Sequence, residues 1–423
     1  MDLDRLVAKN PHLKPYYRDG SYDFSSTEAQ CLVAEAYLNT YCGLKVNLDR
    51  RKLCPRIPNR LSYLNWCEEA AGVISEFETA QLAIDIGTGS SAIYPLLGVS
   101  RHPELHFIGT EIDPESIAWA RKIVTENNLE DKICILDSAA SSHRPTFPRV
   151  DENIRYTMCN PPFYTNGDDL YERSKFKNSK PNELLSSDSE MFYEGGEVQF
   201  IKDLLHDSIE LAKEKPETVK ACWFSSQIGI KSNCFEVESV LNEAKAARKI
   251  TQFRIDKLQT HGSSTSRWVV AWATHWWRWP TGKAIYTVNL DVKKVHHEIF
   301  QKLEKELAAI EEYYPQLECN LQLSSGNIIV RTNVPFWTRK YRRAFLRRAR
   351  ISPIMSNIYR IETCRIRWVH GCDYQIFYSF CKFIFGIVEQ SGRHSQPWPN
   401  VAQSGKSQDF VYRSETLFSG PED

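Results

Sequence analysis

Residues 82–91 read LAIDIGTGSS, an apolar segment that runs directly into a turn with two glycines. Glycine lets a ligand approach the backbone closely, and the helix predicted to start at residues 92–97 would offer free N–H groups beside that turn. A strand, a glycine turn and a helix in this order form the first unit of a parallel α/β sheet, with a ligand site at the sheet edge. The stretch therefore predicts an α/β fold.

An acidic residue follows one strand later. The strand predicted at residues 106–110 ends in Glu111, and Asp113-Pro114 caps and opens a helix that extends to Val124. In dinucleotide-type folds, an acid at the end of the second strand binds ribose hydroxyls. Glu111 is therefore predicted to hold the ribose of a cofactor.

The glycine pattern indicates which cofactor this is. Asp85, Gly87 and Gly89 form the pattern D-x-G-x-G. It is neither the longer G-x-G-x-x-G of nicotinamide enzymes nor a phosphate loop with Gly-Lys-Ser/Thr. The shorter turn suits S-adenosylmethionine, because this cofactor has no pyrophosphate for the loop to hold. Together with Glu111, the pattern predicts an S-adenosylmethionine site.

The motif Asn160-Pro161-Pro162-Phe163 follows the strand predicted at residues 156–159. An amine conjugated with a ring is a poor nucleophile, because its lone pair is delocalised. The Asn160 side-chain oxygen and the Pro161 carbonyl could accept its two N–H groups, and the prolines make the loop stiff. Phe163 or the following Tyr164 could stack on a flat base. An ordinary turn has the same composition, but the upstream glycine turn favours methyl transfer to such an amine.

Length and composition exclude several classes of protein. At 423 residues the chain is long enough for two or three domains. Its 53 basic and 53 acidic residues leave no global charge signal, so a nucleic-acid surface must be a local patch. Twelve cysteines without a C-x-x-C pair predict a reduced intracellular protein with no metal site. No signal peptide is expected, and no apolar run approaches the roughly 18 residues of a membrane span.

The chain is predicted to contain two folded domains and a tail. Residues 1–283 form the first domain, with an N-terminal helical extension that includes a helix at residues 26–41. Residues 284–391 alternate between strand and helix patterns and predict a small two-layer α+β domain. Residues 392–423 are rich in Ser, Gln, Gly and Pro and are predicted to be disordered. The later strands are expected at 219–224, 250–255 and 268–274 in the first domain, and the last strand of the second domain at 359–369.

The most basic part of the chain lies in the second domain, at residues 339–350, and contains no acidic residue. If this segment is helical, Trp337, Tyr341 and Phe345 share one face and the charges cover the remainder. Arginine at this density favours RNA phosphates and bulged RNA. An acidic protein partner or a nuclear-import signal are the alternatives. The predicted RNA-binding residues are Arg339, Lys340, Arg342, Arg343, Arg347, Arg348 and Arg350.

Two loops near the predicted site are candidates for substrate contact. Residues 165–193 form a long polar stretch, which is typical of either a disordered segment or a substrate lid. The loop at residues 261–267 ends in Arg267, which is a candidate RNA phosphate ligand. A surface arginine beside a strand is the alternative for this residue.

Six motifs in the first 280 residues resemble those of one family. They are RLSY at 60–63, IDIGTG at 84–89, IYPLLG at 93–98, TEID at 110–113, NPPF at 160–163 and EGGE at 194–197. The combination is similar to the methyltransferase-like RNA adenine methyltransferases, whose eukaryotic members modify U6 small nuclear RNA and whose bacterial branch acts on large ribosomal RNA. The resemblance implies a seven-stranded Rossmann-like fold and transfer of a methyl group from S-adenosylmethionine to the exocyclic amine of an adenosine.

The resemblance also assigns roles to single residues. It implies that Asn160, Pro161, Pro162 and Phe163 hold the adenine. The family has an arginine where this chain has Ser264, so one of its RNA phosphate contacts is in question here. The cofactor contacts, taken from the motif positions together with the glycine turn, are Arg60, Asp85, Gly87, Gly89, Ser91, Glu111, Ser142 and Asn160.

The second domain favours a eukaryotic enzyme. Residues 285–391 resemble the kinase-associated-like RNA-binding domain of vertebrate members in strand order and basic character, and bacterial members lack it. The resemblance implies an enzyme acting on U6 small nuclear RNA, with a role in splicing. We expect a monomer, in the nucleus or alternatively in the cytoplasm. Three alternatives stay open: a ribosomal RNA substrate, a glutamine amide or DNA adenine substrate, and an RNA-binding factor with little catalytic use.

Overall fold

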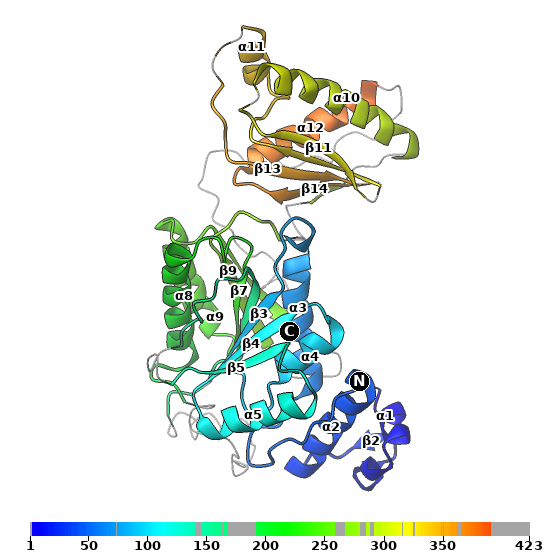
Figure 1. Cartoon of the computed structure of the whole chain (residues 1–423), viewed down its shortest axis with the longest axis vertical. Coiled ribbons are helices and arrows are strands. Elements are labelled where there is room, and N and C mark those ends of the chain that lie inside the picture. Colours follow the sequence, from blue (N-terminus) through cyan, green and yellow to red (C-terminus); the bar gives the residue numbers. More distant parts are fainter. Residues whose placement is uncertain are drawn as a thin grey trace, which may run out of the picture. The chain divides into compact units, whose positions relative to one another are not determined.

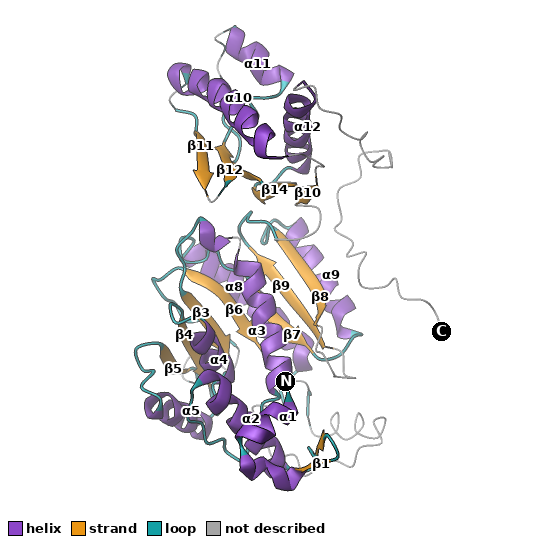
Figure 2. Ribbon diagram, turned by 90° about the vertical axis from the view of Figure 1, so that its right-hand side faces the viewer, coloured by secondary structure: helices purple, strands orange, loops and turns teal. Residues whose placement is uncertain are grey.

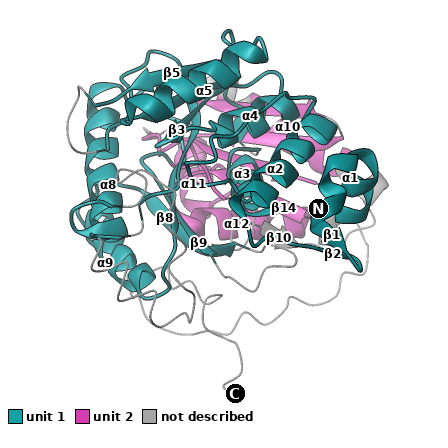
Figure 3. Cartoon of the chain, turned by 90° about the horizontal axis from the view of Figure 1, so that it is seen from below, with its two compact units in different colours: residues 1–275, 414–423 teal, residues 276–413 magenta. Residues whose placement is uncertain are grey.

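The computed structural model describes residues 2–72, 74–139, 145–162, 164–166, 192–258, 267–279, 285–287, 292–314, 316–324, 326–347, 349, 351–362 and 365–390. The chain divides into two compact units, residues 1–275 and residues 276–413 (Figure 3). Each unit has its own hydrophobic core, as an independent domain requires.

Seven strands form the centre of the first unit. Four are parallel and lie in the order β5-β4-β3-β6, and three lie in the order β7-β9-β8, with β9 antiparallel to both neighbours. A parallel bridge between Tyr156 and Trp223 joins β6 to the second group. The predicted seven-stranded α/β sheet is therefore confirmed. The strands are β3 (Leu82–Ile86), β4 (His106–Glu111), β5 (Ile133–Asp137), β6 (Ile154–Cys159), β7 (Phe224–Ile228), β8 (Gln252–Leu258) and β9 (Arg267–Ala273).

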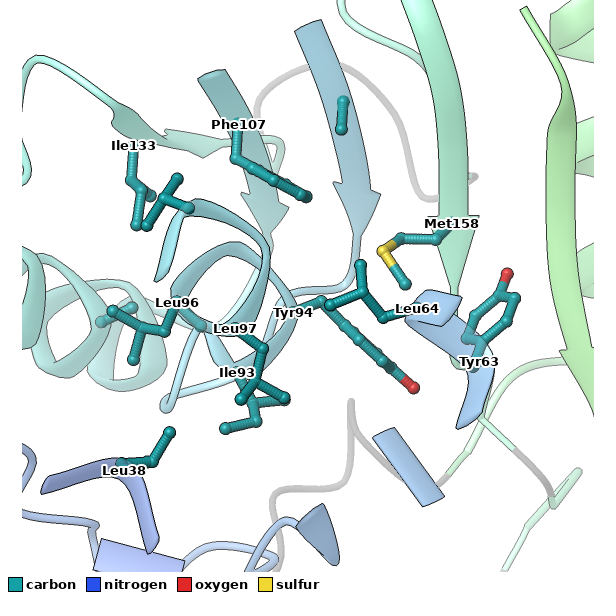
Figure 4. Close-up of a cluster of buried hydrophobic side chains, with 14 of the residues drawn as sticks. Leu38, Tyr63, Leu64, Ile93, Tyr94, Leu96, Leu97, Phe107, Ile133 and Met158 are labelled. Atoms are coloured by element: carbon teal, nitrogen blue, oxygen red, sulfur yellow. The ribbon is translucent and has the colours of Figure 1, made fainter. Parts of the chain in front are cut away.

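Helices cover both faces of this sheet (Figures 1 and 2). Side chains alternate between the faces along β3, so Ala83 packs with helices α2 to α5 and Ile84 packs with α8 and α9. Figure 4 shows the first of these cores, which contains Tyr63, Tyr94 and Met158. The helices are α1 (Leu3–Lys9), α2 (Thr27–Cys42), α3 (Ile57–Gly72), α4 (Ile93–Arg101), α5 (Pro114–Glu126), α8 (Gly196–Glu214) and α9 (Asn233–Ala246).

Short polar side chains start two of the predicted helices. The Ser26 hydroxyl accepts a hydrogen bond from the Ala29 N–H at 3.1 Å at the start of α2. The Asp113 carboxylate accepts one from the Ser116 N–H at 3.2 Å, and Pro114 is the first residue of α5. Each cap satisfies an N–H group that has no partner inside the helix. The predicted helix starts are confirmed at both places.

The strand predicted at residues 219–224 is wrong. The strand begins at Phe224 and extends to Ile228. Val219 and Cys222 are buried in the segment that leads into the sheet, so their apolar character reflects burial and not strand pairing. The strand itself contains Ser225, Ser226 and Gln227, whose buried polar side chains form hydrogen bonds inside the unit. An apolar pattern cannot identify such a strand.

The second unit is an antiparallel sheet of five strands in the order β10-β14-β13-β12-β11. Helices α10 and α12 pack against one face of it (Figure 2). This arrangement agrees with the predicted two-layer α+β domain. Its elements are β10 (Ile285–Thr287), α10 (Val292–Tyr313), β11 (Cys319–Ser324), β12 (Asn327–Thr332), α11 (Arg339–Leu346), β13 (Asn357–Ile361), β14 (Arg365–His370) and α12 (Tyr374–Gln390).

The strand predicted at residues 359–369 is wrong, because this stretch belongs to a hairpin of two strands. β13 and β14 pair antiparallel, and the Glu362 N–H donates to the Arg365 carbonyl at 2.8 Å across the turn. The Glu362 carboxylate also binds the Arg367 guanidinium at 3.1 Å. The turn sequence has neither glycine nor proline, so the usual signal for a hairpin is missing.

The boundary between the units lies earlier than residue 283, since the division falls between His275 and Trp276. Trp277 forms a bridge with His370 of the second sheet. The Arg278 N–H donates to the Val369 carbonyl at 2.9 Å, and its guanidinium lies 4.0 Å from the centre of a ring of β14, that of Trp368. These contacts make the tryptophan-rich segment part of the second unit.

The predicted tail, residues 392–423, lies outside the described residues. Among the residues that the structure describes, no helix has both the length and the apolar character needed to cross a bilayer.

Candidate active site

The glycine turn is held between the ends of β3 and β4. Gly87 and Gly89 have φ values of 70° and 67°, a region that favours glycine. Between them, the Thr88 N–H donates to the Thr110 carbonyl at 2.9 Å. A Cβ at Gly109 would lie 2.9 Å from the Thr88 side chain, so β4 also needs glycine at the point of contact. The turn is therefore rigid before any ligand binds.

Glu111 lies beside this turn, at the carboxyl end of β4. One carboxylate oxygen accepts the Gly89 N–H at 2.9 Å, and the other accepts the Ile112 and Asp113 N–H groups at 2.7 and 3.0 Å. Burial raises the pKa of this carboxyl, and the three backbone bonds oppose that rise. Two elements predicted from separate parts of the sequence thus meet, and Glu111 orients the backbone of the turn.

Asp85 and Arg60 bring opposite charges to the same edge of the sheet. Asp85 is 1% exposed; its Oδ2 accepts the Thr88 hydroxyl at 2.8 Å, and its Oδ1 is buried without a hydrogen-bond partner among the described residues. Burial raises the pKa of Asp85 to about 7, while the positive charge of Arg60 and the Thr88 bond oppose the rise. Arg60, in the first turn of α3, donates to the Tyr94 hydroxyl at 3.0 Å and has a buried, unpartnered Nε within the described part of the chain.

These two buried polar atoms fit the amino-acid end of S-adenosylmethionine. That end carries an ammonium, which suits the open oxygen of Asp85, and a carboxylate, which suits the open N–H of Arg60. A buried polar atom without a partner costs free energy, and a ligand that supplies the partner removes this cost. The residues that the structure brings together therefore match the predicted cofactor. Ser91 is also buried at this edge, directly after the turn, whereas Ser142 lies outside the described residues.

The predicted catalytic motif follows a strand end that α3 holds in place. The Tyr63 hydroxyl accepts the Cys159 N–H at 3.2 Å and bonds the Ser225 hydroxyl at 2.8 Å. Ser225 in turn donates to the Thr157 carbonyl at 2.7 Å. The next residue, Asn160, is half-buried and directly follows this anchored strand end. Sequence reasoning missed this role of Tyr63, although its spacing from Arg60 puts both on one side of a helix.

The segment after the motif packs on the start of α8. Tyr164 pairs with Phe192, and the Tyr193 N–H donates to the Tyr164 carbonyl at 3.0 Å. A Cβ at Gly196 would lie 3.2 Å from the Thr165 hydroxyl. The two described ends of the long loop are thus joined at the site. Phe163 and residues 167–191 lie outside the described residues. The prediction that residues 165–193 form a lid or a disordered segment therefore stays a prediction.

Glu197 is a second residue that sequence reasoning missed as a structural support. It is 1% exposed and accepts the Gly229 and Ile230 N–H groups at 2.8 and 3.2 Å and the Asn233 amide at 2.7 Å. It thereby ties the first turn of α8 to the loop after β7, at the carboxyl edge of the sheet. A depression of about 260 Å³ lies beside it, lined in part by Thr165 and Lys202. The signal that the sequence offered for this role was the position of Glu197 as the last residue of the EGGE motif.

Arg267 is the first residue of β9 and is half-buried. Because β9 is antiparallel, it begins at the edge where the parallel strands end. Burial, together with the positive charges of Arg60 and Arg56, lowers the pKa of Arg267. The predicted phosphate ligand therefore lies near the predicted cofactor arginine.

The basic segment of the second unit forms the short helix α11 and the residue that follows it. Tyr341 and Phe345 pack against the core as predicted, and Trp337 is buried just before the helix. Its exposed charges are Arg339, Lys340, Arg342, Arg343 and Arg347. Arg348 and Arg350 lie outside the described residues. A surface of five cations with an apolar underside is suited to a polyanion.

Comparison with known proteins agrees with the predicted family and class of enzyme. The family model described as an RNA methyltransferase matches residues 1–275. The U6 small nuclear RNA (adenine-(43)-N(6))-methyltransferase of Schizosaccharomyces pombe is 28% identical over 86% of this chain and 94% of its own length. The ribosomal RNA large subunit methyltransferase F of Pseudomonas putida is 32% identical over 65% of this chain and 86% of its own length.

A solved structure shares the fold of the first unit. The hMettl16 catalytic domain in complex with the MAT2A 3'UTR hairpin 1 is 28% identical, with a TM-score of 0.52, over 65% of this chain and 91% of that chain. The fold, the glycine turn and the open buried polar atoms of Asp85 and Arg60 define an S-adenosylmethionine-dependent methyltransferase. More particularly, the chain belongs to the family of RNA methyltransferases, as the six motifs predicted.

Proposed function

We propose that this protein transfers a methyl group from S-adenosylmethionine to the N6 atom of an adenosine in U6 small nuclear RNA. The observation that supports this substrate is the extent of the similarity. The U6 enzyme of Schizosaccharomyces pombe matches 86% of the chain, which is more than the first unit alone can supply. The bacterial ribosomal RNA enzyme matches only 65%. The match to the U6 enzyme therefore extends beyond the first unit.

The chain's own residues do the chemistry by positioning. When bound, S-adenosylmethionine supplies a methyl group on a positively charged sulfur. The Asn160 side-chain oxygen and the Pro161 carbonyl accept the two N–H groups of the adenine amine and direct its lone pair. Oriented acceptors of this kind stabilise the positive charge that grows on the nitrogen, and the excess proton leaves to water. No histidine or lysine is required as a strong base.

The second unit contributes affinity. The exposed cations of α11 bind the phosphates of a folded RNA, and binding of this kind is independent of sequence and weakens with salt. The first unit then selects the nucleotide by accepting one adenosine, turned out of the RNA, at Asn160. The division explains why a methyltransferase with a complete site would retain a second basic domain.

The experiment offers the enzyme two RNAs. Labelled cofactor is incubated with a U6 transcript and with a large-ribosomal-RNA fragment, and the labelled nucleotide is identified by nuclease digestion and chromatography. We expect N6-methyladenosine in the U6 transcript only. Label in the ribosomal fragment would favour the bacterial-type activity instead, and label on protein or DNA would reject an RNA substrate.

The proposal also covers the oligomeric state of the protein, its location in the cell and the process in which it acts. We propose a monomer that acts in the nucleus and takes part in pre-mRNA splicing, because U6 RNA functions there. Sedimentation of the full chain should give a mass near 48.9 kDa, and fluorescence of a tagged chain should be nuclear. A dimer mass or an exclusively cytoplasmic signal would contradict these points.

A further inference from the structure

Two arginines from different elements reach the same side of the active-site edge. Arg60 donates to the Tyr94 hydroxyl at 3.0 Å, and Gln227 of β7 donates to the same oxygen at 2.7 Å. Gln227 pairs with Val269 of β9, and Val269 packs in the core on the α3 side of the sheet. Arg267 lies two residues before Val269, so its side chain points to this same side.

A third arginine, Arg56, joins this pair through α3. The Arg60 N–H donates to the Arg56 carbonyl at 3.2 Å, which is the hydrogen bond of a helical turn. Arg56 is the residue directly before α3, so this bond places its backbone one turn from Arg60, at the same end of the helix. Arg56 is exposed. Within the described part of the chain, no ion pair neutralises its charge.

The electrostatics of Arg267 show that the three charges interact. Burial is the largest cause that lowers its pKa, and the positive charges of Arg60 and Arg56 are the next two. The carboxylate of Glu197 opposes this effect in part. Holding like charges together costs free energy, because each disfavours the charged form of the others. An anion bound among them would remove that cost, and strand and helix already fix the backbone positions of the arginines.

We propose that Arg56 and Arg267 together bind one backbone phosphate of the RNA beside the target adenosine. This inference rests on the proposed function and adds Arg56 to its substrate site. Arg60 is assigned to the cofactor, because its Nε is buried without a partner in the described part of the chain and its positive charge acts on Asp85. S-adenosylmethionine contains no phosphate, so a phosphate at Arg56 and Arg267 comes from RNA. Guanidinium groups bind phosphate through paired N–H donors, which fixes the direction of the backbone.

The position of this site explains what the phosphate does. Arg267 also interacts electrostatically with Tyr164, the residue directly after the catalytic motif. A phosphate held there would lie next to the base that Asn160 accepts. Binding energy from this contact is available to keep the extruded nucleotide in its reactive position. Arg56 and Arg267 are therefore positioning residues for the substrate.

The test uses RNAs with a single neutral linkage. A short U6-derived RNA is made with one methylphosphonate at a time around the target adenosine, and single-turnover methylation is measured. For wild type, we expect one linkage to slow the reaction about tenfold, the effect of losing a charge-assisted contact. Arg56→Gln should slow methylation of the unmodified RNA several-fold, and the same linkage should then cost less than it does in wild type, because only Arg267 still binds that phosphate. Arg267→Gln should behave in the same way.

Two controls accompany these variants. Arg248 is an exposed arginine in the turn before β8, at the opposite edge of the sheet, so Arg248→Gln should keep the rate and the linkage effect of wild type. The affinity of Arg56→Gln for S-adenosylmethionine should equal that of wild type. An equal loss of cofactor affinity would overturn the proposal, and so would a linkage effect in Arg56→Gln that is as large as in wild type.

RNA affinity separates this inference from the proposed function. Fluorescence anisotropy with the same modified RNAs repeats the comparison without methyl transfer. Wild type could lack methylation activity and still bind the RNA more weakly when one linkage is neutral, with a smaller loss in Arg56→Gln. That result would support the phosphate site and reject the proposed reaction. An active wild type without any linkage-specific effect would keep the reaction and reject the phosphate site.

Discussion

The active-site edge of the first unit and the α11 surface of the second unit both carry charged residues. The charged groups are buried at the active-site edge and exposed on α11. At the active-site edge, Asp85 and Glu111 are buried and bonded to the backbone or to neighbouring side chains. On α11, cations such as Arg339 and Arg343 are exposed, over an apolar underside. Buried charges are fixed in place and suit chemistry, whereas exposed charges adapt to a partner and suit affinity.

The largest expected effect is at the catalytic motif. Asn160→Ala removes the predicted acceptor for the adenine amine and should lower the rate of single-turnover methylation about 100- to 1000-fold. RNA affinity should change little, because phosphate contacts carry most of it. A near-normal methylation rate would contradict the comparison, because the chemistry would then not depend on Asn160 at the active-site edge.

Glu111 should be next. Glu111→Ala removes the predicted ribose acceptor and the acceptor of three backbone N–H groups. We expect S-adenosylmethionine binding to weaken by about 1.5 to 3 kcal/mol in calorimetry. Glu111→Gln, which keeps the side-chain carbonyl, serves as the milder control. Unchanged affinity in both variants would show that the ribose lies elsewhere.

The burial of Asp85 should make both protein stability and cofactor binding depend on pH. Asp85 has a pKa of about 7 in the folded protein, above about 3.9 in an unfolded chain. The free protein should therefore lose stability as the pH rises from about 4 through 7, because ionised Asp85 is buried. The cofactor ammonium favours the ionised form, so affinity should rise up to about tenfold between pH 6 and 8. Asp85→Asn should abolish the rise in affinity in calorimetry and reduce the loss of stability in thermal unfolding, of which buried Glu111 keeps a share.

The exposed cations of α11 should affect RNA affinity and not cofactor binding. Replacing Arg339 and Lys340 with glutamine should weaken RNA binding several-fold and reduce the salt dependence by about one to two phosphate contacts. Cofactor affinity should not change. The matched control replaces Arg248 and Lys249, an exposed pair in the first unit. If this control weakens RNA binding equally, α11 has no special part in it.

The smallest expected effect tests the anchor of the strand end. Tyr63→Phe removes the acceptor of the Cys159 N–H and the bond to Ser225. We expect the methylation rate to fall about threefold and the free energy of unfolding to fall by about 1 kcal/mol, the usual net value of a buried hydrogen bond. A rate loss with an unchanged KM for RNA would indicate positioning of Asn160. A raised KM at an unchanged rate would indicate that Tyr63 serves binding only.

Much of the first unit was predictable, because its signals are local. Asp85, Gly87 and Glu111 lie where short strands end, and in a parallel sheet those ends converge at one edge. The caps at Ser26 and Asp113 also act within one turn of helix. Strands with unusual composition were not predictable, as β7 shows with its buried polar residues. Their hydrogen-bond partners come from distant parts of the chain.

The sequence was sufficient for the class of fold, the cofactor and the family, because each depends on a spacing of a few residues. It was not sufficient for the supports of the site. The Tyr63 hydroxyl meets Ser225 across 162 positions of the chain, and Glu197 meets Asn233 across 36. The charges of Arg56 and Arg267 interact because an antiparallel strand starts at the edge where parallel strands end. Such meetings depend on chain topology, which no local pattern of side chains encodes.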